Sequence, residues 1–248
     1  MKNYLLAAVL VSLISACVQK QDAAYLIKQS IEASGGERYT NSVIDFDFRD
    51  HHYQVSRSPE EWTMLRIKAD SGQKTVDTFS GKSFSRSIND SLVEPPDSMI
   101  FKYQESINSV FYFALLPFKL DDAAVIADRL PDEQIDGKMH YKIEIRFKEE
   151  GGGEDFQDVF IYWFDQQDYS LDYLAYSFQV NGGGLRFRKA YNERVIGGIR
   201  FVDYLNFKAP KEMAVENLAA QFEAGKLEEL SRIELENIEV ERKREIMK

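Results

Sequence analysis

The stretch from Phe160 to Phe207 contains four consecutive apolar runs: Phe160-Ile-Tyr-Trp-Phe164, Leu171-Asp-Tyr-Leu-Ala-Tyr-Ser-Phe-Gln-Val180, Leu185-Arg-Phe-Arg-Lys-Ala-Tyr191 and Ile199-Arg-Phe-Val-Asp-Tyr-Leu-Asn-Phe207. Turn-forming residues separate these runs: Asp165-Gln-Gln-Asp168, Asn181-Gly-Gly-Gly184 and Gly197-Gly198. Connections this short predict antiparallel pairing, because parallel neighbours need crossovers of about a dozen residues or more. The stretch therefore predicts an antiparallel meander.

The first of these runs is apolar on both of its faces. Ile161 and Trp163 point opposite to Phe160, Tyr162 and Phe164, so we expect a covering layer on each side of the sheet there. By contrast, the preceding strand from Met139 to Phe147 alternates strictly. Its polar positions, which we expect to face solvent, are His140, Lys142, Glu144 and Arg146.

A first meander is predicted upstream, where the apolar period is also two. Its strands are Val43–Phe48, Tyr53–Val55, Trp62–Ile67, Lys74–Phe79 and Ser83–Ile88. The breaks at Ser71-Gly72-Gln73 and Ser80-Gly81-Lys82 have the length of hairpin turns. We therefore expect these strands to pair in sequential order.

Helical spacing appears in four further segments. Asp22 can cap a helix that ends at Gly35-Gly36. A second helix follows Pro95-Pro96 and carries the apolar segment Phe111–Phe118, which is too short to span a membrane. That helix either packs on the sheet or forms a lid over an apolar cavity. We also expect short helices at Asp121–Leu130 and Ala214–Ala224.

The C-terminal segment Leu230–Val240 combines helical charge content with alternating β-branched residues. We expect a strand rather than a helix, with a bulge near Asn237 that switches the apolar phase. With 248 residues and 44% hydrophobic content, the chain suits a single domain with a sizeable core. Its net charge of -10 disfavours nucleic acid as a partner.

The N-terminus has the pattern of an export signal, with Lys2 before the uncharged apolar segment Tyr4–Ala16. Ile14-Ser15-Ala16-Cys17 resembles the bacterial lipobox, which implies that Cys17 is diacylated and becomes the mature N-terminus. Cys17 is the only cysteine, so an internal disulfide is excluded. The alternatives are an ordinary secretory peptide or an uncleaved anchor. We expect a signal peptide at 1–16, a lipidated anchor and leader at 17–21, and one domain at 22–248.

The sequence contains no recognisable catalytic or metal-binding motif. The three histidines lack zinc-ligand spacing, and the adjacent His51 and His52 would point to opposite faces of a strand. The acidic loop Glu149–Asp155 lacks the ligand spacing of an EF-hand and is interpreted as a solvated hairpin. We therefore expect no metal, no cofactor and no enzymatic activity.

Charged residues interrupt several of the apolar strands. A buried arginine near an aspartate could form a structural ion pair or bind an anionic ligand head group, whereas an exposed one needs no explanation. The interrupting residues are Arg66, Asp77, Arg186, Arg188, Arg200 and Asp203.

The lipobox, the helix ending in Gly35-Gly36, the turn entry Tyr162-Trp163-Phe164-Asp165 and the segment Gly197–Tyr204 together resemble an uncharacterised bacterial lipoprotein family. Its members look like relatives of the Lol-type lipoprotein carriers. That resemblance implies a mainly β (α+β) fold: a curved antiparallel half-barrel sheet with helices packed in or across its concave side. It brings no assigned reaction.

Lol-type carriers shield acyl chains in an apolar hollow, so the resemblance implies a lipid or other hydrophobic ligand. The candidate ligand-binding residues are Phe111, Phe113, Leu116, Trp163, Arg188 and Arg200. We expect a lipoprotein anchored through Cys17 in a Gram-negative envelope, on the periplasmic side of the outer membrane. The alternative is a structural or protein-interaction lipoprotein whose sheet is filled by its own side chains; an enzyme is the third hypothesis.

Overall fold

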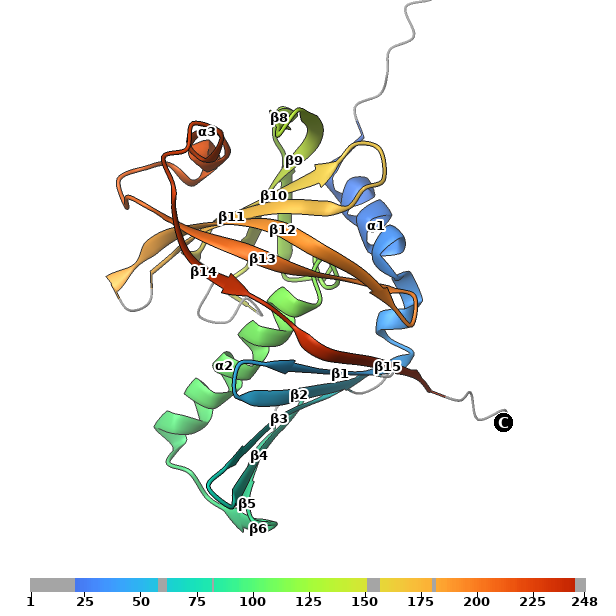
Figure 1. Ribbon diagram of the computed structural model, residues 1–248, viewed down its shortest axis with the longest axis vertical. Coiled ribbons are helices and arrows are strands. Elements are labelled where there is room, and N and C mark those ends of the chain that lie inside the picture. The colour runs from blue at the N-terminus through green and yellow to red at the C-terminus, as the bar shows by residue number, and fades with distance from the viewer. Residues whose placement is uncertain (1–20, 58–61, 82, 151–156, 180–181, 244–248) are drawn as a thin grey trace, which may run out of the picture.

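The computed structural model describes residues 21–57, 62–81, 83–150, 157–179 and 182–243. These residues form two curved antiparallel sheets, neither of them closed into a barrel (Figure 1). The predicted fold class is therefore confirmed, with the sheet divided in two. Cys17 and the predicted signal peptide lie outside the described residues.

The first sheet has seven strands and corresponds to the predicted first meander. Its sequential order confirms the predicted hairpins, and Ser71 and Gly72 turn the chain with φ of 50° and 83°. The C-terminal strand joins its other edge. The order is β15 (Glu236–Arg242), β1 (Ser42–Phe48), β2 (His51–Arg57), β3 (Trp62–Asp70), β4 (Gln73–Ser80), β5 (Ser83–Ile88) and β6 (Ser91–Val93).

The second sheet has eight strands and contains the four apolar runs between Phe160 and Phe207. Its order is β14 (Glu228–Ile233), β13 (Ile199–Ala209), β12 (Gly184–Ile196), β11 (Leu171–Phe178), β10 (Phe160–Asp165), β9 (Lys138–Phe147) and β7 (Val125–Arg129), with β8 (Glu133–Ile135) pairing β9.

Both faces of β10 are covered, as predicted, and every residue of the strand is buried. Tyr162 belongs to a core cluster that includes Leu26 of the helix α1 (Ala23–Ser34). Trp163 belongs to a different cluster, with Leu218 of α3 (Leu218–Glu223). The 3-10 helix η4 (Val215–Asn217) precedes α3, so the predicted helix at 214–224 is confirmed.

The long helix α2 (Asp97–Ala114) connects the two sheets (Figure 1). Ile107 and Phe111 are buried in the core of the seven-stranded sheet. Tyr112 and Phe113 pack instead against the core of the eight-stranded sheet. The apolar residues of α2 therefore pack against both sheets. No helix of the described residues is long and apolar enough to cross a membrane.

Two expectations about the middle of the chain were wrong. The segment 121–130 contains the strand β7 rather than a helix, because β9 provides a hydrogen-bonding edge that overrides local helical propensity. His140 and Lys142 do not face solvent, being 0% and 8% exposed. Lys142 Nζ donates to the Glu216 carbonyl at 2.7 Å, so η4 covers the face that alternation assigned to water.

The C-terminal segment forms strands, as predicted, but each belongs to a different sheet. The register of β15 on β1 shifts between Asp45 and Asp47, and Asn237 has φ of 50°, which confirms the bulge. Between the two strands, the buried Leu235 donates its N–H to Asp203 Oδ1 at 3.0 Å. Arg194 holds both oxygens of Asp203 at 2.8 Å. This pair fixes the point where the chain crosses between sheets.

Candidate ligand cleft

A cleft of about 520 Å³ lies between α2 and the eight-stranded sheet. The turn between β1 and β2 contributes to its rim, and β14 lines a further side. It is lined by Phe48, Arg49, Ser109, Val110, Phe113, Ala114, Tyr176, Arg186, Arg188, Val202, Tyr204, Asn206, Leu230, Ser231, Ile233 and Leu235. Ligand pockets in proteins typically enclose about 300 to 1,000 Å³, so the cleft is of the size that holds a small molecule.

Much of the lining is apolar because two elements turn apolar residues toward it. On α2, Val110, Phe113 and Ala114 follow helical spacing and share one side. On β13, Val202 and Tyr204 share one face of the strand. Burial raises the pKa of Tyr204 to about 12, so its hydroxyl stays neutral.

Arg188 places a guanidinium group inside this apolar surrounding. The residue is only 7% exposed, and its guanidinium carbon lies 3.9 Å from the centroid of the Phe113 ring. Its Nη2 donates to the Tyr176 hydroxyl at 2.8 Å. Its Nε and Nη1 are buried and have no hydrogen-bond partner among the described residues. The cleft therefore contains a buried cation with unused donors.

Asn206 adds a second unused polar group beside Arg188. The two residues are paired in register across β12 and β13, which places them on the same face of the sheet. Asn206 Nδ2 donates to Ser231 Oγ at 3.1 Å, while its buried Oδ1 has no partner among the described residues. Arg188, Asn206 and Ser231 thus form a hydrogen-bonding edge beside the apolar residues Val202 and Tyr204.

The charge of the lining differs in sign from that of the chain. The protein carries a net charge of -10. The described lining residues include Arg49, Arg186 and Arg188 but no aspartate or glutamate. An anionic group is therefore attracted to the cleft despite the acidic protein around it.

The structure brings two of the six predicted ligand-binding residues together, Phe113 and Arg188, which are in direct contact. The other four lie outside the cleft lining. Phe111 packs edge-on against Phe46 and Tyr53 in the core of the seven-stranded sheet, with ring centroids 5.6 and 5.7 Å apart.

Leu116 is buried in the core between α1 and the eight-stranded sheet. Trp163 lies on the opposite face of that sheet, where its Nε1 donates to Glu133 Oε2 at 2.8 Å. Arg200 lines a second, polar pocket and donates through Nε to Glu193 Oε2 at 2.7 Å.

Arg66, Asp77 and Asp203 form structural ion pairs, one of the alternatives that the sequence offered. Arg186 forms none among the described residues; its Nη1 donates to the Leu185 carbonyl at 2.9 Å. Asp77 is buried and accepts hydrogen bonds from both Arg66 and Arg86, with shortest distances of 2.7 and 2.6 Å. Arg66 also donates to Ser106 Oγ on α2 at 2.9 Å. This network joins three strands of the seven-stranded sheet to the helix.

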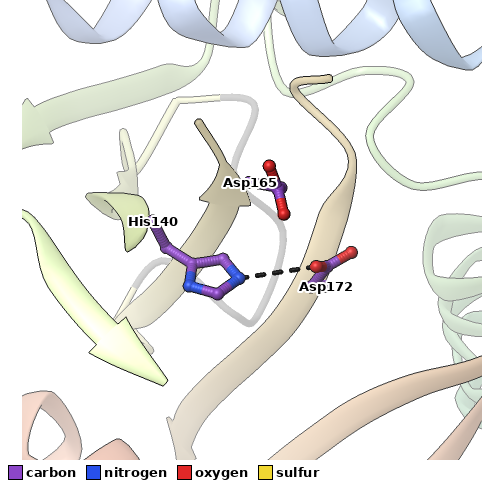
Figure 2. A group of neighbouring side chains, drawn as sticks. All are labelled: His140, Asp165 and Asp172. Carbon is purple, nitrogen blue, oxygen red and sulfur yellow. Dashed lines mark hydrogen bonds and ion pairs between the residues drawn. The ribbon is translucent and has the colours of Figure 1, made fainter. Parts of the chain in front are cut away.

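A separate group of potential metal ligands lies where β9, β10 and β11 meet (Figure 2). His140 Nε2 is 3.4 Å from Asp172 Oδ2. Lys138 Nζ lies 3.2 Å from Asp165 Oδ2, and Arg200 Nη2 lies 3.7 Å from Asp172 Oδ1. Two cations thus already accompany the two carboxylates. A metal ion would have to displace the Lys138 ammonium group, so we do not assign this group to metal binding.

Sequence reasoning missed Tyr176, Asn206 and Ser231 as parts of the cleft. For Asn206 a signal was present, because it continues the apolar phase of Val202 and Tyr204 with a polar residue. For Ser231 no local signal exists, since its role depends on β14 pairing with β13.

Comparison with known proteins places the chain in a family. Residues 2–235 match a family of unknown function, DUF6503, so the chain belongs to that family. No curated protein matches the sequence. The chain is similar in structure to several solved proteins, among them a LolA superfamily protein and a putative outer membrane lipoprotein-sorting protein domain.

One similar structure is a LolA superfamily protein from Nitrosomonas europaea, with 12% identity, a TM-score of 0.48, and coverage of 91% of this chain and 95% of that one. A DUF1329 family protein from Desulfovibrio piger is also similar, with 12% identity and a TM-score of 0.47. The match covers 88% of this chain and 92% of that one. A putative outer membrane lipoprotein-sorting protein domain from Vibrio parahaemolyticus has 10% identity and a TM-score of 0.40. That match covers 73% of this chain and 86% of the domain. At these values the function has to be inferred from the residues of this chain.

Proposed function

We propose that this protein is a membrane-anchored lipoprotein of the bacterial cell envelope that holds a lipid or another hydrophobic ligand in the cleft between α2 and the eight-stranded sheet. The single observation that carries the proposal is the cleft of about 520 Å³ itself. Its walls are built from Val110, Phe113, Val202 and Leu235, which favour an apolar ligand over water. A sheet filled entirely by its own side chains would leave no such volume.

Acylation of Cys17 is the second part of the proposal. Two or more acyl chains attach a protein stably, since each buried methylene contributes about 0.8 kcal/mol. Residues 17–21 then connect the membrane to α1, and residues 22–248 form the ligand-holding domain. A tethered protein cannot shuttle freely, so we assign it a receptor or holding role on the periplasmic side of the outer membrane.

The proposal is tested by titrating the full chain, carrying Cys17→Ser to prevent acylation and stripped of co-purified lipid, with the uncharged fluorophore N-phenyl-1-naphthylamine. We expect saturable fluorescence enhancement with one site per chain. Ser109→Trp, which places an indole at the cleft, is expected to lower the affinity at least about tenfold, while Lys102→Trp, at an exposed position of α2 about two turns before Ser109 and outside the lining, leaves it unchanged. Equal binding by all three chains would contradict the proposal.

A further inference from the structure

The guanidinium of Arg188 is buried without a compensating anion. Among the described residues it forms no ion pair, and its Nε and Nη1 have no hydrogen-bond partner. Leaving charged donors buried and unpaired is costly, so such groups in proteins are normally paired with an acid or a ligand. Arg188 therefore retains donors that a ligand can use.

Other arginines of the same sheet show what a paired environment looks like. Arg194 holds both carboxylate oxygens of Asp203. Arg200 donates to Glu193 and lies 3.7 Å from an oxygen of Asp172. In the part of the chain that the structure describes, Arg188 contacts Tyr176, through its hydroxyl and its ring, and the face of Phe113. It differs from these arginines in having no carboxylate partner among the described residues.

The position of Arg188 in the sheet separates an apolar from a polar region. Direct register pairs run across five strands, from Tyr162 to Leu174, Arg188, Asn206 and Ser231. All five side chains share one face, because directly opposed residues point the same way. The row begins in the apolar core and ends in groups that donate and accept hydrogen bonds. Tyr162 and Leu174 do not line the cleft, so the row contributes the polar groups of Arg188, Asn206 and Ser231 to the lining, while apolar contacts come from residues such as Val110 and Phe113 of α2.

The amide of Asn206 completes the polar end. Its Oδ1 has no partner among the described residues, and a half-turn of the amide group would present Nδ2 instead. The side chain can therefore accept from a hydroxyl or donate to an anion beside Arg188. Arg49 and Arg186 also line the cleft, and no acidic residue opposes them among the described lining residues.

We infer that the ligand of this cleft is an amphiphile with an anionic head group, which Arg188 binds through its free guanidinium nitrogens while the acyl chain contacts Val110, Phe113 and Leu235. This inference rests on the proposed function and narrows the ligand class from hydrophobic molecules in general to anionic lipids with a carboxylate or a phosphate head.

The test is a competition series against N-phenyl-1-naphthylamine, on the same Cys17→Ser full chain. Hexadecanoate, hexadecyl phosphate and the uncharged hexadecan-1-ol have the same chain length and differ in the head group. We expect at least one of the anions to displace the fluorophore about tenfold or more better than the alcohol, as charge-assisted hydrogen bonds imply. Whichever anion binds more tightly identifies the head group.

Arg188→Met should remove the preference for anions while retaining displacement by the alcohol. Arg188→Lys should restore part of it, since it keeps the charge without the planar fork. Arg146→Met is the matched control, because Arg146 lies exposed on β9 outside the cleft lining and should leave the preference intact.

Thermal denaturation provides an independent readout that also shows whether each variant folds. The preferred anion should raise the Tm of the parent and of the Arg146→Met variant more than hexadecan-1-ol does, whereas the two ligands should raise the Tm of Arg188→Met equally. Equal displacement by anions and alcohol, or a preference that survives in Arg188→Met, overturns this inference and leaves the proposed function standing. Failure of the fluorophore to bind the parent chain refutes the proposed function itself.

Discussion

The guanidinium carbon of Arg188 lies 3.9 Å from the centroid of the Phe113 ring, so a strand residue and a helix residue meet across the cleft. This contact links β12 to α2. The helix is tied to the sheet a second time by the hydroxyl pair of Tyr112 and Tyr162, 2.6 Å apart. The two contacts define α2 as one wall of the cleft, and the volume of the cleft depends on where that helix lies.

A larger side chain on this wall should exclude the ligand without unfolding the protein. Ser109 is exposed and lines the cleft from α2, so Ser109→Trp adds volume where solvent now has access. We expect the affinity for the uncharged fluorophore to fall at least about tenfold, with Tm nearly unchanged. Fluorescence titration measures the affinity, and calorimetry measures Tm. If Ser109→Trp does not fold, the smaller substitution Ser109→Phe replaces it.

Removing the carboxylate of Asp77 should destabilise the seven-stranded sheet. Asp77→Asn leaves Arg66 and Arg86, whose side chains are 11% and 17% exposed, without their anion. We expect a loss of about 3 kcal/mol in the free energy of unfolding, measured by urea denaturation.

The matched control for this change is Asp128→Asn, because Asp128 forms an exposed pair with Arg146. Its expected effect is within about 0.5 kcal/mol. Similar losses in both variants would mean that the network around Asp77 contributes no more than a surface ion pair.

Lowering the pH should destabilise the segment around Leu235, where the chain passes from one sheet to the other, because Asp203 then becomes protonated. Burial alone raises the pKa of this carboxyl, but hydrogen bonds from Arg194, the Leu235 N–H and Asn192 outweigh it, so the pKa lies below its ordinary value of 3.8. A carboxyl with a lowered pKa in the folded state stabilises the protein at any pH above its unfolded pKa. That stabilisation declines as the pH falls below 3.8 and is lost once the pH passes through the folded pKa.

Comparison of the parent with Asp203→Asn isolates this contribution. The difference in unfolding free energy between the two chains should be constant near neutral pH and shrink as the pH falls below about 4. Urea denaturation at a series of pH values measures it. A difference that stays constant down to acid pH would show that the carboxylate charge does not stabilise the crossing.

The anchor is tested separately from the cleft. Cells producing the protein should incorporate labelled palmitate into it, and Cys17→Ser should abolish the label, because Cys17 is the only cysteine. The variant should also leave the membrane fraction if processing depends on acylation. Labelling that persists in Cys17→Ser would place the acyl chains elsewhere.

Much of the fold follows from local pattern. The short apolar runs 160–164, 171–180, 185–191 and 199–207 predict β10 to β13, and the short turns between them set their order. The apolar residues on both faces of β10 predict two covering layers. These features are encoded within each segment, so they can be predicted without tertiary information.

The positions of residues relative to the cleft depend on elements that are distant in the chain. The alternation of polar and apolar residues along β9 cannot show that η4 covers Lys142, because that contact joins residues 142 and 216, which are far apart in the sequence. It also cannot show which face of β10 turns toward α2, which is why Trp163 and Phe113 appeared in one predicted site. Arg188 was found because a charge interrupted an apolar strand. That its Nε and Nη1 have no partner among the described residues depends on the packing of the neighbouring strands and of α2 around it.

Binding of a hydrophobic ligand in the cleft can be detected by native mass spectrometry of the full Cys17→Ser chain purified from bacterial cells without detergent. We expect a bound species of lipid mass that dissociates on activation, is absent from the Ser109→Trp variant and persists in Lys102→Trp. A spectrum that shows only the unliganded mass, even after incubation with hexadecanoate, hexadecyl phosphate and hexadecan-1-ol, would contradict the account.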